Sequence, residues 1–390
     1  MTRMTPRTRA KTLRACLCYL AITATVPVFA EHEAPTRTGL WVTQKISESA
    51  ANPAGFEAAI RANPHLSGVS VHVGWNEIET EAGKPDFTSI DKTIAVLQRL
   101  KMKYELSLKP GVNTPTYVFQ QGAQSISTQV TNPHRPNFGQ AVTVPVPWDS
   151  IYQRNFSRVL SQLGERYAAD PLCVGVVLTC ANFMGAEMHL PKRPEDRTKW
   201  QAMGNYEEKL IKVYSKYTDE WAKAFPHQQI SLHLSKVLNL PSTFNERIIE
   251  YGLSKYPQRF TIQNCQLTGR TEDTGKMSYD LVMKYRDRLH HGFQSLAGFS
   301  HGGERMGSIQ MAVLNVVHAD GEYWELWHDD GLSAETSGAV ATAWDEAKRL
   351  GYDAYKKKLM SEGSYRLREQ DTYRRHGKHR GRPDLEEPEI

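Results

Sequence analysis

Residues 67–108 read SGVSVHVGWNEIETEAGKPDFTSIDKTIAVLQRLKMKYELSL and predict one complete repeat of the fold. The valine-rich run 67–73 and the run 104–108 have the length and composition of buried strands. Between them, residues 90–100 place apolar side chains at the spacing of an amphipathic helix. A strand, a helix and another strand in this order predict two parallel strands joined by a crossover helix.

The same alternation continues on both sides of this unit. The other strand-like runs are residues 39–44, 173–180, 229–234, 260–265, 294–299 and 323–327. The other helical patterns are residues 151–167, 206–224, 241–255, 278–289 and 339–360. Eight strands that alternate with helices most simply close into a (β/α)8 barrel, the TIM barrel. The sequence therefore predicts the α/β class, with a single barrel domain over residues 31–363.

Two segments do not follow this alternation. Residues 109–148 contain six prolines and are far longer than an ordinary connection between a strand and a helix. Because this segment follows the third strand, it is predicted to be a long loop on the catalytic rim, where it would form a lid or a substrate wall. Residues 364–390 have a basic half and an acidic half, and they are predicted to be a disordered tail.

The first thirty residues have the layout of a cleavable signal peptide. Five basic residues and no acidic residue occupy positions 1–14, and a mostly apolar run follows at positions 15–30. This run falls short of the ~20 apolar residues that a membrane-spanning helix needs. Cleavage is expected after Ala30, so the mature protein is expected to be secreted or periplasmic and free of the membrane. An uncleaved interfacial anchor is the alternative.

Charge and cysteine content argue against several functional classes. The five basic residues of the leader equal the net charge of +5, so the mature chain is neutral and shows no preference for nucleic acid. Only Cys173, Cys180 and Cys265 remain after cleavage. Their number is odd and their spacing does not fit a zinc site, so they are expected to be buried free thiols.

The end of the second predicted strand carries a longer motif. It comprises Trp75, Ile78-Glu79, Gly83, Asp86-Phe87 and Asp91. Over residues 67–115 this pattern resembles the second strand–helix unit of the clan A (β/α)8-barrel glycoside hydrolases, which include β-galactosidases and cellulases. The resemblance implies a hydrolase that cleaves O-glycosidic bonds of an oligo- or polysaccharide without a cofactor. In this pattern Glu77 and Glu79 are structural or rim residues and are given no catalytic role.

The resemblance also implies where the catalytic carboxylates lie. Enzymes of the clan carry a general acid after strand four and a nucleophile at the end of strand seven, which correspond here to Glu187 and Glu304. The clan commonly has Asn directly before the acid, whereas Asn182 precedes Glu187 by five residues. Glu325, in the eighth predicted strand, is the alternative for either role. Cleavage with retention of the anomeric configuration is expected.

Two carboxylates are needed because glycosidic cleavage passes through an oxocarbenium-like state. One protonated carboxyl donates to the leaving oxygen, while an ionised carboxylate attacks the sugar or activates water. Glu187 has the apolar sequence neighbours Phe183, Met184 and Met188. They predict a raised pKa that keeps this residue protonated. Arg305, directly after Glu304, would keep that carboxylate ionised.

Aromatic rings and side-chain amides complete the expected substrate site. The residues assigned to it are Gln44, Trp75, Asn182, Gln263, Asn264, Trp324 and Trp327. The tryptophans would stack on a pyranose ring, and the amides would bind hydroxyl groups. Burial of some of these tryptophans in the core is the alternative. The histidines are dispersed along the sequence without the spacing of a metal site, so no metal is predicted.

Two other functions are kept as alternatives. Residues 298–302 read GFSHG and match the nucleophile elbow of serine hydrolases, which would make Ser300 the nucleophile. An α/β-hydrolase needs an acid and a histidine after this motif, and before the tail only His318 and His328 follow His301. The second alternative is a barrel that binds polysaccharide without cleaving it, which the altered spacing of Asn182 and Glu187 would fit.

Overall fold

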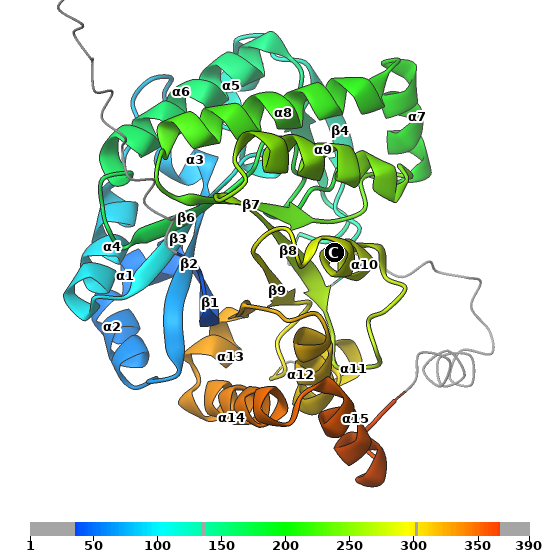
Figure 1. The fold of residues 1–390 in the computed structure, drawn as a ribbon. Helices are drawn as coiled ribbons and strands as arrows, with labels where there is room; N and C mark the ends of the chain where they lie inside the picture. The colour runs from blue at the N-terminus through cyan, green and yellow to red at the C-terminus, as the bar shows by residue number, and fades with distance from the viewer. Residues whose placement is uncertain (1–35, 134–136, 301–302, 367–390) are drawn as a thin grey trace, which may run out of the picture. The chain divides into compact units, whose positions relative to one another are not determined.

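The computed structural model describes residues 36–133, 137–300 and 303–366. Its centre is a closed barrel of eight strands, with the helices outside the ring (Figure 1). Around the ring the strands are β1 (Gly39–Lys45), β2 (Leu66–Gly74), β3 (Lys103–Lys109), β6 (Cys173–Val177), β7 (Gln229–Leu234), β8 (Phe260–Leu267), β9 (His291–Ser295) and β10 (Tyr323–Leu326). Each pairs in parallel with both neighbours, and β10 closes the ring against β1. The predicted (β/α)8 barrel is confirmed.

Helices connect each strand to the next. The longer ones are α2 (Pro53–Arg61), α4 (Thr88–Leu100), α6 (Ser150–Tyr167), α8 (Tyr206–Ala224), α9 (Ser242–Lys255), α10 (Met277–Tyr285), α12 (Ile309–His318), α14 (Ala334–Leu350) and α15 (Tyr352–Ser361). In α6, Phe156, Val159 and Leu163 are buried at spacings of three and four residues, so one apolar stripe packs into the core. Asp149 caps this helix by accepting two backbone N–H bonds.

Two predicted elements have different bounds in the structure. The helix expected over residues 339–360 is divided into α14 and α15 at Gly351, whose φ of +77° ends the first helix. The strand expected at 294–299 is wrong, because β9 spans His291–Ser295. His291 and Gly292 interrupt the apolar pattern and so hid the strand. Gly292 is required there, since an added Cβ would lie 2.3 Å from the ring of Tyr323.

Alternation along the strands separates an apolar outer face from a polar lumen. In β2, Val69, Val71 and Val73 are buried in the main apolar core. Their neighbours Ser70 and His72 contact acidic side chains of other barrel strands. Because successive side chains of a strand point to opposite faces, the polar set lines the inside of the barrel.

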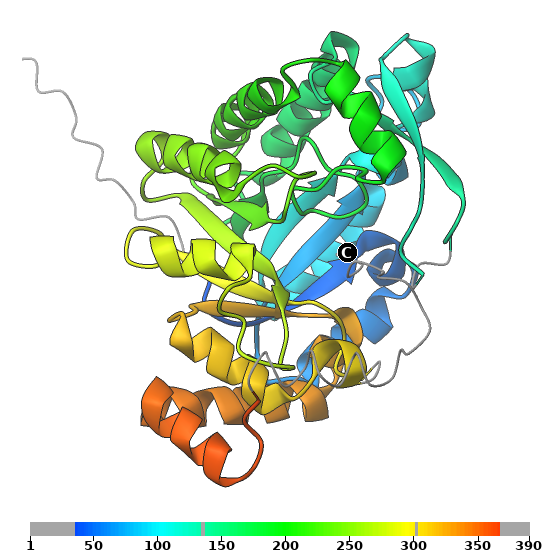
Figure 2. The same cartoon turned by 90° about the vertical axis from the view of Figure 1, so that its right-hand side faces the viewer.

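The segment 109–148 is more ordered than the loop predicted for it. It contains a 3-10 turn (Gly111–Asn113), α5 (Thr116–Gln120) and an antiparallel hairpin of β4 (Ser125–Gln129) and β5 (Ala141–Pro145). The hairpin extends along one side of the barrel in Figure 2. The Thr128 hydroxyl donates to Asp196 of α7 (Pro194–Ala202) over 2.6 Å, and Lys199 donates to the carbonyl of Ser127. The hairpin is therefore anchored on α7.

The remaining sequence expectations concern the cysteines, membrane-spanning helices and the two ends of the chain. Cys173, Cys180 and Cys265 are free and buried, as predicted. None of the helices in the described ranges is long and apolar enough to cross a membrane. The proposed signal peptide and all but the first three residues of the proposed tail lie outside the described residues.

Glu79 is a structural residue, as its place in the motif implied. Its buried carboxylate accepts hydrogen bonds from the indole of Trp75 (2.9 Å), the amide of Gly83 (2.8 Å), the hydroxyl of Tyr117 (2.7 Å) and the guanidinium of Arg158. Burial alone would raise the pKa of Glu79, but the bonds from Arg158, Trp75 and Tyr117 outweigh it and lower the pKa.

Replacing Glu79 by Ala is expected to reduce the free energy of unfolding by about 2–4 kcal/mol, because several buried donors lose their acceptor. The lowered pKa means that the stabilising charge is present above pH 4.5 and is lost as the pH falls below it. Urea unfolding at pH 7 and pH 4 measures both effects. The destabilisation should be smaller at pH 4, and a constant difference would contradict the assignment.

Candidate active site

Glu187 lies in the loop between β6 and α7, at the carboxyl-terminal mouth of the barrel. Asn182 organises this loop: it accepts from the amide of Cys180 (2.9 Å) and donates to the carbonyls of Ala186 (2.8 Å) and Glu187 (2.7 Å). The amide of Met188 donates to the carbonyl of His233 on β7 over 3.0 Å. The backbone of Glu187 is therefore fixed beside the end of β7.

The side chain of Glu187 is held among imidazoles. It is 13% exposed, one of its oxygens is 3.9 Å from Nδ1 of His189, and that oxygen is buried without a hydrogen-bond partner. Burial alone would raise the pKa of Glu187, but His189, His233 and His72 outweigh it and lower the pKa. The prediction of a raised pKa was wrong, because it considered the apolar neighbours of Glu187 and not His189, two residues along the loop, or His233 and His72, which the fold brings near the carboxylate.

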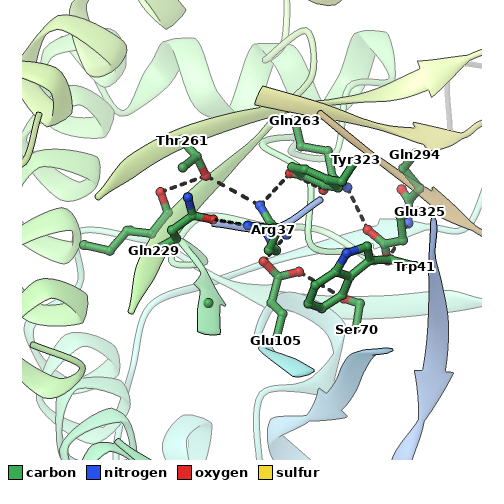
Figure 3. A network of polar contacts seen from close by, with 12 residues as sticks. Arg37, Trp41, Ser70, Glu105, Gln229, Thr261, Gln263, Gln294, Tyr323 and Glu325 are labelled. Atoms are coloured by element: carbon green, nitrogen blue, oxygen red, sulfur yellow. Dashed lines mark hydrogen bonds and ion pairs between the residues drawn. The ribbon is translucent and has the colours of Figure 1, made fainter. Parts of the chain in front are cut away.

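A second carboxylate, that of Glu325 on β10, lies in the lumen of the barrel. Gln263 donates to it over 2.8 Å and Gln294 over 3.4 Å (Figure 3), and Nε2 of His72 is 3.5 Å away. Burial opposes ionisation, but the nearby imidazoles of His72 and His233 and the hydrogen bond from Gln263 outweigh it and lower the pKa of Glu325 to about 2. His72 and His233 act on both Glu187 and Glu325, so the two carboxylates share one pair of imidazoles.

An ion pair that sequence analysis missed fills the lumen near Glu325. Arg37, just before β1, binds the carboxylate of Glu105 and the hydroxyl of Tyr323, and its guanidinium lies 4.0 Å from the centre of the Tyr323 ring (Figure 3). Ser70 donates to the other oxygen of Glu105 over 3.1 Å. Burial raises the pKa of Glu105 to about 7 against the opposing effect of Arg37. An acidic residue inside an apolar strand was the available signal, since buried charges are usually paired.

Several buried polar groups of the barrel strands and the mouth have no hydrogen-bond partner among the described residues. The buried side-chain atoms concerned include both ring nitrogens of His233, the hydroxyls of Ser107 and Ser231, and one oxygen each of Gln44 and Glu187. Native proteins satisfy most buried polar atoms. Such a group of unpaired donors and acceptors indicates a place for water, an ion or a polar ligand.

The three tryptophans assigned to a sugar platform have different environments. Trp75 is fully buried, donates to Glu79 and packs on Tyr152 and Phe156, so it belongs to the core. Trp324 is also fully buried and does not form a platform. Trp327 is 36% exposed, with its indole N–H fixed on the carbonyl of Ser295 (2.7 Å). Of the three, Trp327 has a ring available for stacking.

The four amides assigned to substrate hydroxyls are buried. Asn182 orders the Glu187 loop, Gln263 bridges Tyr323 and Glu325, and Asn264 accepts from the amide of Gln266. Gln44 donates to a neighbouring carbonyl over 3.0 Å, and its oxygen has no partner. Asn182, Gln263 and Asn264 therefore hold other protein groups of the site in place by hydrogen bonds. Because their amides are engaged within the protein, sequence position alone could not show their role.

Glu304 lies on the rim, in the short helix α11 (Gly303–Met306) that follows β9. The amide of Gly269, in the segment after β8, donates to the carbonyl of Met306 over 2.6 Å, and Gly269 forms a bridge with Gly307. The backbone is thus placed near the carboxyl ends of β8 and β9. The side chain of Glu304 lies outside the described part of the chain.

The serine-hydrolase elbow does not form around Ser300. β9 ends at Ser295, so Ser300 stands five residues beyond the strand rather than at a strand-to-helix turn. The amides of Phe299 and Ser300 both donate to the carboxylate of Asp330, the latter over 3.1 Å. Residues 298–300 of the motif therefore belong to a rim loop held by Asp330.

The sequence matches no protein-family model, and no curated protein is significantly similar to it. Two solved structures share the fold. The β-galactosidase of the psychrophilic Marinomonas ef1 has 12% identity and a TM-score of 0.51 over 83% of this chain and 62% of that chain. The cold-adapted β-galactosidase of Rahnella sp. R3 has 10% identity and a TM-score of 0.50 over 80% of this chain and 57% of that chain.

The chain therefore shares the (β/α)8-barrel fold of these two β-galactosidases. The barrel spans about three fifths of the length of these two enzymes, 62% and 57% respectively. In a barrel of this fold, active sites lie at the carboxyl ends of the strands. That is the end at which Glu187 and α11 are found.

Proposed function

We propose that the protein is a secreted glycoside hydrolase that cleaves an oligo- or polysaccharide at the carboxyl-terminal mouth of the barrel. The observation that carries the proposal is Glu187. Its backbone is held by Asn182, its carboxylate has an unpaired oxygen, and it lies where this fold binds substrate. The Glu187 side chain is 13% exposed, so part of it can be reached from the mouth.

The charge states suggest a division of roles. Because its pKa is lowered, Glu187 is the ionised member of the pair in the free protein, which suits attack on the sugar or activation of water. The proton for the leaving oxygen would then come from Glu304. These roles are the reverse of those that the sequence resemblance implied.

Glu325 is less suited to contact the substrate. It is 1% exposed, and both of its oxygens already accept hydrogen bonds from Gln263 and Gln294. A sugar could not reach so deeply buried a carboxylate. We therefore assign Glu325 to the lumen and keep Glu187 and Glu304 as the catalytic pair.

Hydrolysis is expected to proceed with retention of the anomeric configuration. Retaining enzymes hold their two carboxyl groups about 5–5.5 Å apart, whereas inverting enzymes need roughly 6.5–9.5 Å to admit water. A panel of aryl glycosides and oligosaccharides identifies a substrate, and proton NMR of the first-formed anomer gives the stereochemistry. The inverted anomer as first product would exclude a covalent intermediate.

The hairpin β4–β5 is expected to shape the substrate site more than the fold. The amide of Val146 donates to the carbonyl of Gln124 over 2.9 Å, so residues 125–145 can be replaced by a two-residue turn that joins these neighbours. Asp196 then keeps Arg193 as its partner at 2.9 Å. Ile126 and Val144 of the hairpin are buried, so Tm is expected to fall by about 2–4 °C for each kcal/mol of packing lost, while kcat/KM for a polymer falls at least about tenfold.

A matched assay on a small aryl glycoside separates the two effects of removing the hairpin. Its hydrolysis should change little, since the wall would bind only the longer substrate. A large fall in Tm together with equal losses on both substrates would make the hairpin a structural element.

The proposal that the protein is exported is based on its N-terminal segment, residues 1–30. Expression of the full chain with secretion is expected to release a protein that begins at Glu31, which N-terminal sequencing detects. An intact leader on membrane-bound protein would favour the interfacial anchor instead.

Binding without cleavage is the second candidate, because Asn182 and Glu187 are five residues apart rather than adjacent. Calorimetric titration with oligosaccharides distinguishes it: a folded wild-type protein that binds them but never hydrolyses them would be a carbohydrate-binding barrel.

A further inference from the structure

Three ligand-type side chains meet in the centre of the barrel, below the mouth. Glu105 of β3, His233 of β7 and Glu325 of β10 each offer one oxygen or nitrogen, and these three atoms lie within 4.8 Å of one another. The residues are 0%, 1% and 1% exposed. They come from strands far apart in the sequence, and only closure of the barrel brings them together.

His233 has no protein partner in this position. Both of its ring nitrogens are buried, and neither makes a hydrogen bond to a described residue. Leaving a buried donor or acceptor unsatisfied costs about 1–3 kcal/mol. A neutral imidazole with a free nitrogen that faces two carboxylates is the arrangement found around bound metal ions.

The lumen also contains more buried negative charge than its direct partners neutralise. Arg37 forms an ion pair with Glu105. The hydrogen bonds to Glu325 come from the neutral amides of Gln263 and Gln294, with His72 at 3.5 Å. Because unpaired buried charges are costly, a cation bound to Glu325 would stabilise the barrel centre.

We propose that Glu105, His233 and Glu325 bind one divalent transition-metal ion, of which Zn²⁺ is the probe. One imidazole nitrogen and two carboxylate oxygens form a donor set that suits Zn²⁺ rather than a hard cation such as Mg²⁺. Bonds of about 2.0–2.2 Å place ligand atoms a little over about 3 Å apart, so small side-chain adjustments are sufficient.

The groups around the three proposed ligands, Glu105, His233 and Glu325, support this assignment. Ser70 orients Glu105 and Gln263 orients Glu325 by hydrogen bonds of 3.1 and 2.8 Å, as outer-shell residues do around metal ligands. Nε2 of His72 lies 3.5 Å from an oxygen of Glu325, at the edge of this group. The site lies beneath Glu187 and would support the mouth from below. This inference does not rest on the proposed function.

Metal binding is tested on tag-free full-length protein that has been stripped with a chelator. Equilibrium dialysis against Zn²⁺ with elemental analysis should give one ion per chain. Co²⁺ should develop the visible absorption of a site with nitrogen and oxygen ligands, and excess Zn²⁺ should abolish it. Absence of both stoichiometric Zn²⁺ binding and a Co²⁺ spectrum would overturn the proposal, whatever the variants do.

Two variants locate the site. Glu325→Gln keeps the shape of the side chain and should weaken Zn²⁺ binding by more than about 100-fold, because it removes a ligand rather than an outer-shell group. It should also abolish the rise in Tm that Zn²⁺ gives the wild type. The matched control, Glu187→Gln, should bind Zn²⁺ like the wild type. Equal losses in both variants would place any metal at the mouth and contradict the ligand set.

The proposed metal site and the proposed glycoside hydrolase activity can be disproved independently of each other. Wild-type protein that binds Zn²⁺ at Glu325 but hydrolyses no glycoside would leave the metal site standing and remove the proposed function. Hydrolysis by protein that binds no metal would do the reverse.

Discussion

Replacing Glu187 by Gln is expected to lower kcat/KM for an unactivated oligosaccharide by at least about 10³-fold. Each tenfold loss corresponds to 1.36 kcal/mol of transition-state stabilisation, and a carboxylate that attacks the sugar or moves a proton contributes several such factors. The substitution keeps the shape of the side chain and removes its charge. Circular dichroism and a Tm close to that of the wild type would show that the fold is retained.

Aryl glycosides with good and poor leaving groups reveal which step Glu187 serves. A good leaving group departs without protonation, so loss of a general acid harms only the poor substrate. If Glu187 is the attacking carboxylate, as its lowered pKa suggests, both substrates should lose activity together. Retained activity on the good substrate would return Glu187 to the general-acid role that the sequence resemblance implied.

Three other variants provide the comparison. Glu304→Gln should also fall by orders of magnitude on the poor substrate. Ser300→Ala should lose less than about tenfold, since a hydroxyl that only hydrogen-bonds contributes about 0.5–1.5 kcal/mol. Glu325→Gln should be affected less than Glu187→Gln. Folded Glu187→Gln with full activity would exclude Glu187 from catalysis, and loss of ester hydrolysis in Ser300→Ala would identify a serine hydrolase.

Replacing Arg37 by Met is expected to destabilise the fold by about 3–5 kcal/mol, the range for removing one partner of a buried ion pair. Arg37 and Glu105 are 1% and 0% exposed, so water cannot replace the lost partner. The guanidinium also packs on Tyr323 and binds its hydroxyl. Urea unfolding of metal-free protein measures the change in the free energy of unfolding.

The double variant Arg37→Met/Glu105→Gln is the control for this prediction. It removes both charges together, so no buried carboxylate is left uncompensated, and much of the lost stability should return. If Arg37→Met alone costs less than about 1 kcal/mol, or if the two substitutions are simply additive, the pair does not hold the lumen together.

The amino-acid sequence was sufficient to predict the barrel, because its repeats are local. Valine-rich strands and helices with apolar residues at three- and four-residue spacing occur in order along the chain, and α8 was predicted residue for residue. Errors arose where glycine or polar residues interrupt a pattern, as at Gly292 in β9. Strand order needed no further information, since consecutive parallel strands with crossover helices become neighbours.

The sequence also determined which residues lie at the mouth, since parallel strands all end at the same rim. Glu187 and the segment that carries Glu304 were placed there by counting strands. The sequence did not determine which groups surround each side chain. Trp75 and Trp327 are the same residue type, yet Trp75 is buried against Tyr152 whereas Trp327 is 36% exposed. The difference arises because α6 packs over Trp75 and not over Trp327.

Only the tertiary structure decided the chemistry of the lumen. Arg37, Glu105, His233 and Glu325 are separated by tens to hundreds of positions, and no periodicity in the sequence connects them. Closure of the barrel brings their charges within a few ångströms in a medium from which water is excluded, where Coulomb interactions are strongest. The direction in which the pKa of Glu187 was expected to shift was also reversed, first by His189 of the same loop and then by His233 and His72, which closure of the barrel brings near it.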